Sequence, residues 1–203
     1  PYDPACGWTS QSGRMDRVEG DRGGRTGKKA LVAFGTKYGT TSKVAEEIAC
    51  ILRGKGVEAT VLDLREGKRT PVDGYDLIVV GSSIIMDKWS KGAQAFLDGN
   101  REALATKEVA MFVCSGNMYT NPKEIDQYRR AYLDDVAKRF GIDGSAPKGL
   151  FGGEIDFGRF GFLTRAIVNS MMKDMLQGVD LSKPFDFRDW NAIRAWADSL
   201  EVA

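Results

Sequence analysis

Threonines and glycines follow the first apolar run of the chain, and residues of these types could bind an anion. The apolar run is Ala30–Phe34, the threonine- and glycine-rich turn is Gly35–Thr41, and an amphipathic segment begins near Ser42. A strand, a hydroxyl-rich turn and then a helix present backbone N–H groups and a helix N-terminus to a phosphate. The glycines allow close approach of the backbone, and the hydroxyl groups can donate hydrogen bonds. The turn matches neither the Walker pattern nor Gly-x-Gly-x-x-Gly, so an ordinary strand-to-helix connection is the alternative.

The composition restricts the chemistry that the chain can perform without a cofactor. Its 203 residues carry a formal net charge of +1 and include no histidine. This excludes Ser-His-Asp and Cys-His catalysis and histidine-ligated metals, and it gives no basic footprint for nucleic acid. The cysteines (Cys6, Cys50 and Cys114) are too widely spaced for a zinc or iron–sulfur site and indicate no disulfide framework, which fits a reduced cytoplasmic setting. Redox chemistry would therefore need a bound organic cofactor.

Apolar runs alternate with amphipathic segments from Lys28 onward. The apolar runs predict five strands that are buried on both faces, over residues 29–34, 57–62, 76–81, 108–114 and 148–155. The amphipathic segments predict helices over residues 42–53, 91–105, 121–140 and 188–200. Asn121 and Asp186 are the expected N-caps of the last two helices. This alternation predicts a parallel sheet in a three-layer α/β fold.

Two segments fall outside the alternation. Residues 1–27 are rich in glycine and charge, which predicts a flexible N-terminal tail before a single domain over 28–203. Residues of about 157–186 form an insert after or within the fifth strand, and this insert contains an apolar helix, Phe160–Leu176. Cationic residues border the apolar stripe, so the helix could dock a quinone, a porphyrin or a membrane surface. Packing of the stripe on the sheet edge is the alternative.

The segment Phe34–Ala45 resembles the phosphate loop of the flavodoxin family, in which hydroxyl residues surround a glycine and a threonine opens the helix. Tyr38 departs from that pattern, because most flavodoxins carry a small hydroxyl residue there. Three further segments are similar to the flavodoxin-like, menaquinone-dependent protoporphyrinogen IX dehydrogenases. They are Tyr75–Ile84, Phe151–Phe157 and the Phe-Arg-Asp-Trp segment at 187–190. The resemblance covers about Lys28 to Leu200.

The resemblance implies a flavodoxin-like fold with strand order 2-1-3-4-5 and FMN at the carboxyl ends of the strands. The FMN phosphate would contact Thr36, Lys37, Tyr38, Gly39, Thr40 and Thr41. The flavin ring would lie between two later loops, formed by Ser82, Ser83, Ile84, Ile85, Met86 and Trp89, and by Cys114, Ser115, Gly116, Asn117, Met118 and Tyr119. Trp89 would either cover a ring face or pack under the next helix, and Tyr119 would stack on the ring. Cys114 fits a structural thiol better than a nucleophile.

The resemblance also implies a function. The protein would be an FMN-dependent, quinone-linked dehydrogenase of protoporphyrinogen type in heme biosynthesis, with the flavin and no side chain carrying the chemistry. A quinone or a redox protein would accept the electrons, and Arg159, Phe160 and Arg165 of the insert would contact the substrate. The expected location is cytoplasmic, with peripheral contact of the insert helix at the inner face of the membrane. An electron carrier of flavodoxin type and a flavin-binding partner without turnover are the alternatives.

Overall fold

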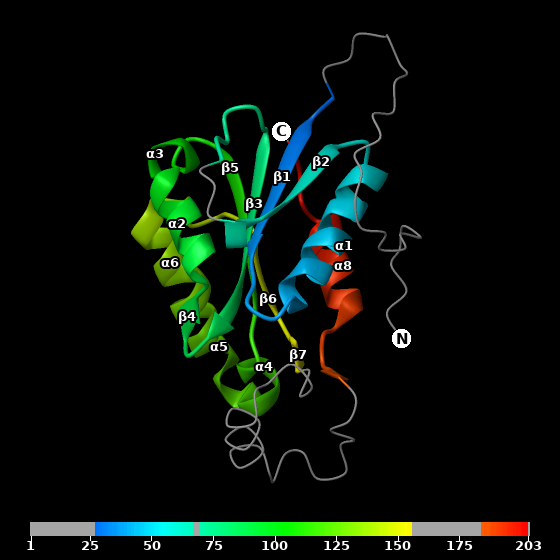
Figure 1. Cartoon of the computed structure of the whole chain (residues 1–203), viewed down its shortest axis with the longest axis vertical. Helices are drawn as coiled ribbons and strands as arrows, with labels where there is room; N and C mark the ends of the chain where they lie inside the picture. The colour runs from blue at the N-terminus through cyan, green and yellow to red at the C-terminus, as the bar shows by residue number, and fades with distance from the viewer. Residues whose placement is uncertain (1–26, 67–69, 156–183, 203) are drawn as a thin grey trace.

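A parallel sheet forms the centre of the computed structural model, which describes residues 27–66, 70–155 and 184–202. Its parallel strands are β1 (Lys29–Gly35), β2 (Glu58–Asp63), β3 (Leu77–Ile85), β5 (Glu108–Cys114) and β6 (Lys148–Phe151). They lie in the order β2-β1-β3-β5-β6 (Figure 1). Numbered along the chain, the parallel strands have the order 2-1-3-4-5, so the predicted flavodoxin-like topology is confirmed.

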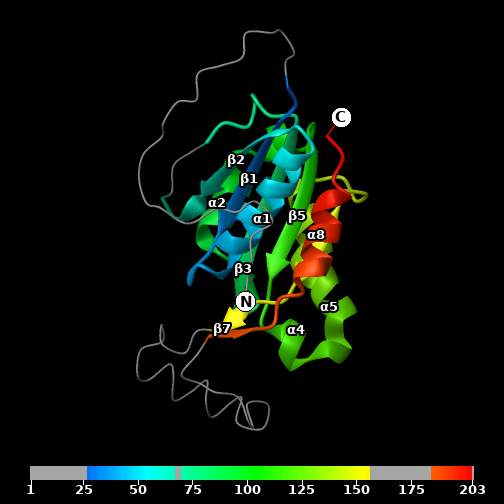
Figure 2. The same ribbon diagram turned by 90° about the vertical axis from the view of Figure 1, so that its right-hand side faces the viewer.

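The strands are apolar on both faces because helices cover both faces. Helices α1 (Thr40–Gly54) and α8 (Trp190–Asp198) contact each other on one face (Figure 2). Helices α2 (Lys91–Gly99), α3 (Arg101–Leu104) and the long helical segment after β5 cover the other face (Figure 1). Each face has its own buried cluster, with Phe112 central to the α1 side and Met111 to the α2 side.

Strand β3 is longer than predicted, and the expected loop from Ser82 to Trp89 is mostly a hairpin. The strand continues to Ile85, turns at Met86 and Asp87, and returns as β4 (Lys88–Trp89), which pairs antiparallel with β3. Both turn residues have positive φ, at 50° and 59°. Such a two-residue turn matches the twist of the strands it joins. Pairing of Ile84 with Trp89 explains why the strand does not end at Gly81.

The predicted fifth strand is divided. Strand β6 ends at Phe151, and after Gly152 and Gly153 the chain forms β7 (Glu154–Ile155), which pairs with β8 (Phe185–Asp186) in a separate two-stranded antiparallel sheet. A Cβ atom at Gly152 would lie 2.4 Å from the Phe187 carbonyl oxygen, so this close approach needs a glycine. Residues 1–26 of the predicted tail and 156–183 of the predicted insert lie outside the described residues.

Three helix predictions need correction. The predicted helix over 91–105 is interrupted at Asn100, between α2 and α3. The Asn121 side chain makes no capping hydrogen bond, and the helix that follows starts with a 3₁₀ turn and contains a π-helical turn. Its segments are η2 (Pro122–Glu124), α5 (Ile125–Arg129), the π-helical η3 (Arg130–Asp134) and α6 (Asp135–Phe140). Asp189, and not Asp186, caps α8, because its side chain accepts a hydrogen bond from the backbone N–H of Ala192.

The cysteines also differ from expectation. Cys50 on α1 is disulfide-bonded. The cysteine spacing indicated no disulfide framework and did not anticipate this bond, so it no longer supports a reduced setting. Cys114, at the end of β5, is a buried free thiol.

Candidate cofactor-binding site

The turn between β1 and α1 lies at the carboxyl edge of the sheet, beside the ends of β3 and β5. Gly39 adopts the left-handed conformation, with φ of 87°, and precedes the first turn of α1. Its backbone N–H donates a hydrogen bond of 3.0 Å to Thr36 Oγ1, and its carbonyl accepts one of 2.5 Å from Ser42 Oγ. The Thr36 hydroxyl accepts within the turn, so its own proton is available to an outside acceptor. A residue with a Cβ would be strained at Gly39.

The N-terminus of α1 is suited to an anion. No side chain caps this helix, and its first turn contains no acidic residue. The first N–H groups of a helix have no partner within it, and the helix dipole favours negative charge there. Thr41 is fully buried, and its Oγ1 has no hydrogen-bond partner among the described residues. An unpaired buried hydroxyl is costly, so this atom indicates a ligand acceptor at the turn.

Gly35 brings the end of β1 close to the start of α2. A Cβ atom there would lie 1.9 Å from Ser90 Oγ. Ser82 pairs with Gly35 across the sheet, and its Oγ accepts a hydrogen bond of 2.9 Å from the Ser90 backbone N–H. Ser82 therefore fixes the start of α2. Its neighbour Ser83, by contrast, has a buried Oγ without a partner in the described chain, as Thr41 does.

The second predicted loop separates into an exposed tip and a buried base. Met86 at the tip is 88% exposed, whereas Ile84 and Ile85 are half-buried. Trp89 is buried in the α2-side cluster, and its indole Nε1 donates a hydrogen bond of 2.7 Å to the Tyr132 carbonyl in η3. The structure thus gives Trp89 the packing role that was its alternative in the sequence.

The third predicted loop follows β5 and begins α4 (Asn117–Thr120). Ser115 is buried, and its Oγ accepts a hydrogen bond of 3.2 Å from the Asn117 backbone N–H. Gly116 and Met118 are half-buried, and Met118 packs against the α2-side cluster. Tyr119 belongs to α4, but its side chain lies outside what the structure describes, so its stacking role stays a prediction.

A hydrogen-bond network joins the second and third loops. Asn117 Nδ2 donates to Asp87 Oδ1 at 3.2 Å and to the Tyr132 hydroxyl oxygen at 2.8 Å. The Tyr132 hydroxyl donates to the same Asp87 oxygen. Burial and then this bond to Asp87 raise the pKa of Tyr132. The network holds the β3–β4 turn against the end of β5, although the sequence assigned no role to Asp87 or Tyr132.

Cys114 is not activated as a nucleophile. Burial raises the pKa of its thiol to about 12, and the charge of Arg188 opposes this only partly. The Thr41 hydroxyl lies close enough to lower the pKa slightly, but it makes no well-formed hydrogen bond to the sulfur. A thiol with so high a pKa is protonated at neutral pH, so the structural role predicted for Cys114 is the one that its surroundings favour.

The remaining predicted residues are placed as follows. Lys37 is exposed, with its Nζ 5.2 Å from the centre of the Tyr38 ring, and Thr40 is half-buried. The predicted substrate contacts Arg159, Phe160 and Arg165 lie outside the described residues. A cavity of about 980 Å³ along α2 and α3 contains none of the predicted site residues. Its lining includes Asp73, Asp98 and Glu102, which do not suit a phosphate.

Comparison with known proteins identifies the family. A family model described as a flavodoxin domain matches residues 31–180. The chain belongs to the flavodoxin domain family. Two relatives named protoporphyrinogen IX dehydrogenase (quinone) are each 23% identical to this flavodoxin domain protein. The one from Leishmania major aligns over 178 residues, 85% of this chain and 74% of that protein. The one from Escherichia coli K12 aligns over 177 residues, 85% of this chain and 94% of that protein.

Solved structures include oxidised Flavodoxin 1 from Bacillus cereus, with a TM-score of 0.48 and 17% identity. That comparison covers 75% of this chain and 100% of the flavodoxin. Within the part of the chain that the structure describes, no helix is long and apolar enough to cross a membrane.

Proposed function

We propose that this protein binds FMN at the carboxyl edge of its sheet and is a quinone-linked dehydrogenase of protoporphyrinogen type. The observation that carries the FMN assignment is the buried hydroxyl of Thr41, which has no partner in the described chain. It lies in the first turn of an uncapped helix. At this point, between β1 and β3, the direction in which successive strands are added to the sheet reverses. Ligands of open α/β sheets bind at this point, and a phosphate satisfies the hydroxyl there.

The residues of the edge have separate tasks in this proposal. Thr36 and Thr41 donate hydrogen bonds to the phosphate, together with the first N–H groups of α1. The hairpin turn and the loop after β5 flank the ring, and Asn117 and Asp87 hold these two loops at a fixed separation. Bound FMN supplies the transfer of electrons and hydride, and the chain binds, orients and shields it.

The assignment to a dehydrogenase is supported by the relatives. The Escherichia coli and Leishmania major proteins both bear the name protoporphyrinogen IX dehydrogenase (quinone), and this chain spans 94% and 74% of their lengths. A quinone is accordingly the proposed electron acceptor. The absence of histidine agrees with a reaction in which the bound cofactor, and not a side chain, supplies the reactive group.

Steady-state oxidation of protoporphyrinogen IX with a menaquinone analogue tests the proposed reaction. The FMN-loaded protein is compared with the same protein after removal of FMN. We expect turnover that depends on both FMN and the quinone. Full FMN loading without activity toward any quinone would contradict the dehydrogenase assignment and leave the FMN assignment intact.

The match to a flavodoxin domain favours a second function, that of an electron carrier between redox proteins. The formal net charge of +1 argues against it, because carriers that are steered to their partners by charge need a strong field. A potentiometric titration separates the two. The dehydrogenase is expected to take up two electrons in one step, whereas two widely separated one-electron steps would favour the carrier.

A further inference from the structure

The segment after β8 contains a buried cation to which the proposed FMN site assigns no role. Arg188 belongs to the Phe-Arg-Asp-Trp segment, and its side chain has no exposed surface. Its guanidinium lies 4.6 Å from the centre of the Trp190 ring. Burial of a charge costs free energy unless the charge is paired and hydrogen-bonded. The partners of Arg188 therefore indicate its structural role.

The partners of Arg188 are two carboxylates and one backbone carbonyl. Nε and Nη2 bind the two oxygens of Asp186, at 2.7 and 2.6 Å. Nη2 also binds Glu154 Oε2 at 2.7 Å. The third partner is the carbonyl of Thr40, which is distant in sequence and accepts a hydrogen bond of 3.2 Å from Nη1. Arg188 therefore joins the β7–β8 ribbon to the first residue of α1.

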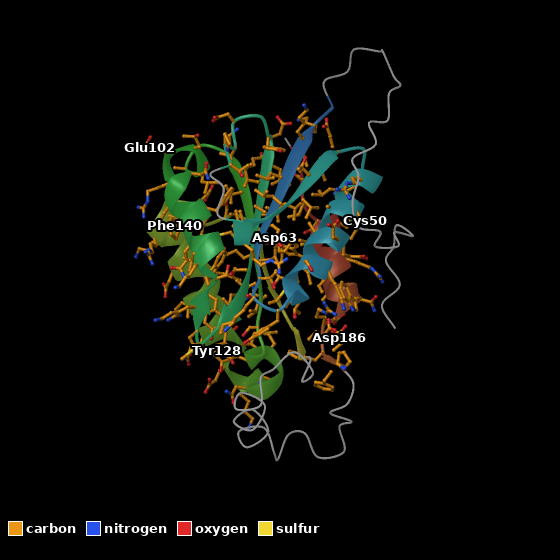
Figure 3. The ribbon with its side chains drawn as sticks, in the orientation of Figure 1. Cys50, Asp63, Glu102, Tyr128, Phe140 and Asp186 are labelled. Carbon is orange, nitrogen blue, oxygen red and sulfur yellow. The ribbon has the colours of Figure 1, made fainter. Side chains whose placement is uncertain are left out.

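Two further interactions tie the same two parts together. Thr40 Oγ1 donates to the Glu154 carbonyl at 3.3 Å, and Lys43 on α1 forms an ion pair of 2.9 Å with the Glu154 side chain. The two cations and the two acids of this cluster balance in charge. The cluster therefore does not attract an anion by net charge; it fixes the position of Thr40 between Gly39 and Thr41. Figure 3 shows Asp186 beside β7, at the end of the molecule where α1 begins.

We propose that Arg188 is the positioning residue of the phosphate loop and sets the preference of the site for FMN over riboflavin. The inference rests on the proposed function, since it presumes that the loop holds the FMN phosphate. Arg188 acts through the Thr40 carbonyl and does not touch the ligand. Its loss lets the first turn of α1 shift, so the phosphate contacts weaken while the ring contacts, which belong to other loops, stay the same.

Titration of the flavin-free full chain with FMN and with riboflavin, followed by flavin fluorescence, tests the inference. We expect Arg188→Met to raise the FMN dissociation constant by about tenfold or more, a change equivalent to one polar interaction. The riboflavin dissociation constant should stay within about twofold of the wild-type value. The ratio of the riboflavin constant to the FMN constant therefore falls. Arg188→Lys retains the charge and part of the bonding, and it should recover part of the FMN affinity.

Arg194→Met is the matched control. Arg194 also lies on the C-terminal segment and binds α1, but its ion pair of 2.5 Å is with the buried Glu47, which lies beyond the first turn of the helix. The Arg194→Met substitution should lower the midpoint of thermal unfolding as Arg188→Met does, without changing the ratio of FMN to riboflavin affinity. If Arg188→Met does not fold, Arg188→Lys alone carries the test.

Equal weakening of FMN and riboflavin, or no weakening of either, would overturn the inference, because both results give Arg188 a purely structural role. If the wild-type protein binds FMN well and the Arg188 variants keep the full preference for FMN over riboflavin, only the inference about Arg188 is overturned. A wild-type protein that binds no FMN overturns the proposed function as well.

Discussion

Replacement of Thr41 by valine changes a buried hydroxyl to a methyl group of similar size, and the structure predicts opposite effects on stability and on binding. In the protein alone, Thr41 Oγ1 is buried and has no hydrogen-bond partner among the described residues. An unsatisfied buried polar group costs about 1–3 kcal/mol. Removal of the hydroxyl should therefore leave the free energy of unfolding of the flavin-free protein unchanged or raise it by about 1 kcal/mol.

The same substitution should weaken FMN binding. A hydrogen bond to a charged group contributes about 1.5–3 kcal/mol, which corresponds to about 10- to 150-fold in the dissociation constant. Riboflavin has no phosphate, so its affinity should not change. Urea unfolding of the flavin-free protein measures the first effect, and fluorescence titration with the two flavins measures the second.

Thr60→Val is the matched control for Thr41→Val. Thr60 is exposed on β2, away from the carboxyl edge of β1, and its substitution should change the affinity for neither flavin. The reasoning is refuted if Thr41→Val destabilises the flavin-free protein by several kcal/mol, or if it binds FMN as tightly as the wild type. The first result would mean that the hydroxyl already has a partner, and the second that it does not face the phosphate.

Three further predictions concern other parts of the site. Trp89→Phe should lower stability by about 1–2 kcal/mol in urea, because a backbone carbonyl of η3 loses its donor, while FMN affinity stays unchanged; a tenfold weaker affinity would assign Trp89 to the ring. The native Cys114 thiol, with its pKa of about 12 against an ordinary 9.0, should resist iodoacetamide at neutral pH, as peptide mapping can show. Its raised pKa stabilises the fold below about pH 9, and this contribution should be lost as the pH rises toward 12; rapid native labelling would contradict both statements. Gly35→Ala should destabilise by about 1–3 kcal/mol through its clash with Ser90, whereas Gly54→Ala, which meets nothing within 4 Å, should not.

The sheet could be predicted from the sequence because its strands are continuously apolar. Strand β1 and strand β5 lie within one residue of the predicted ranges, and the phosphate-loop segment leads into α1 as expected. These features depend on local pattern: a buried parallel strand needs apolar residues on both faces, and a glycine is required where φ is positive. The order of the strands followed from the resemblance and not from the pattern alone.

The features that could not be predicted depend on contacts between distant residues. Ser82 and Ser83 look like a loop, but pairing of Ile84 with Trp89 carries β3 past them. Arg188 resembles ordinary helix-start charge, yet it binds the carbonyl of Thr40, 148 residues earlier. Side-chain type gives no indication of which partner a buried cation will find.

Asp186 shows the same limitation. The sequence suggested a helix cap, whereas in the structure its carboxylate binds Arg188. Burial by itself would raise the pKa of Asp186, but the hydrogen bonds and charge of Arg188 outweigh this effect and lower it. Asp189, which the sequence placed in the first turn of the helix, is the residue that caps it.

The visible absorption spectrum of the purified protein tests the central claim most directly. We expect a flavin spectrum, and after denaturation the released flavin should co-elute with FMN in a ratio of about one per chain, as a single site at the carboxyl edge requires. If the protein is purified without flavin, added FMN should bind and its fluorescence should change. A colourless protein that takes up no FMN, or a protein that releases a different cofactor, would contradict the account.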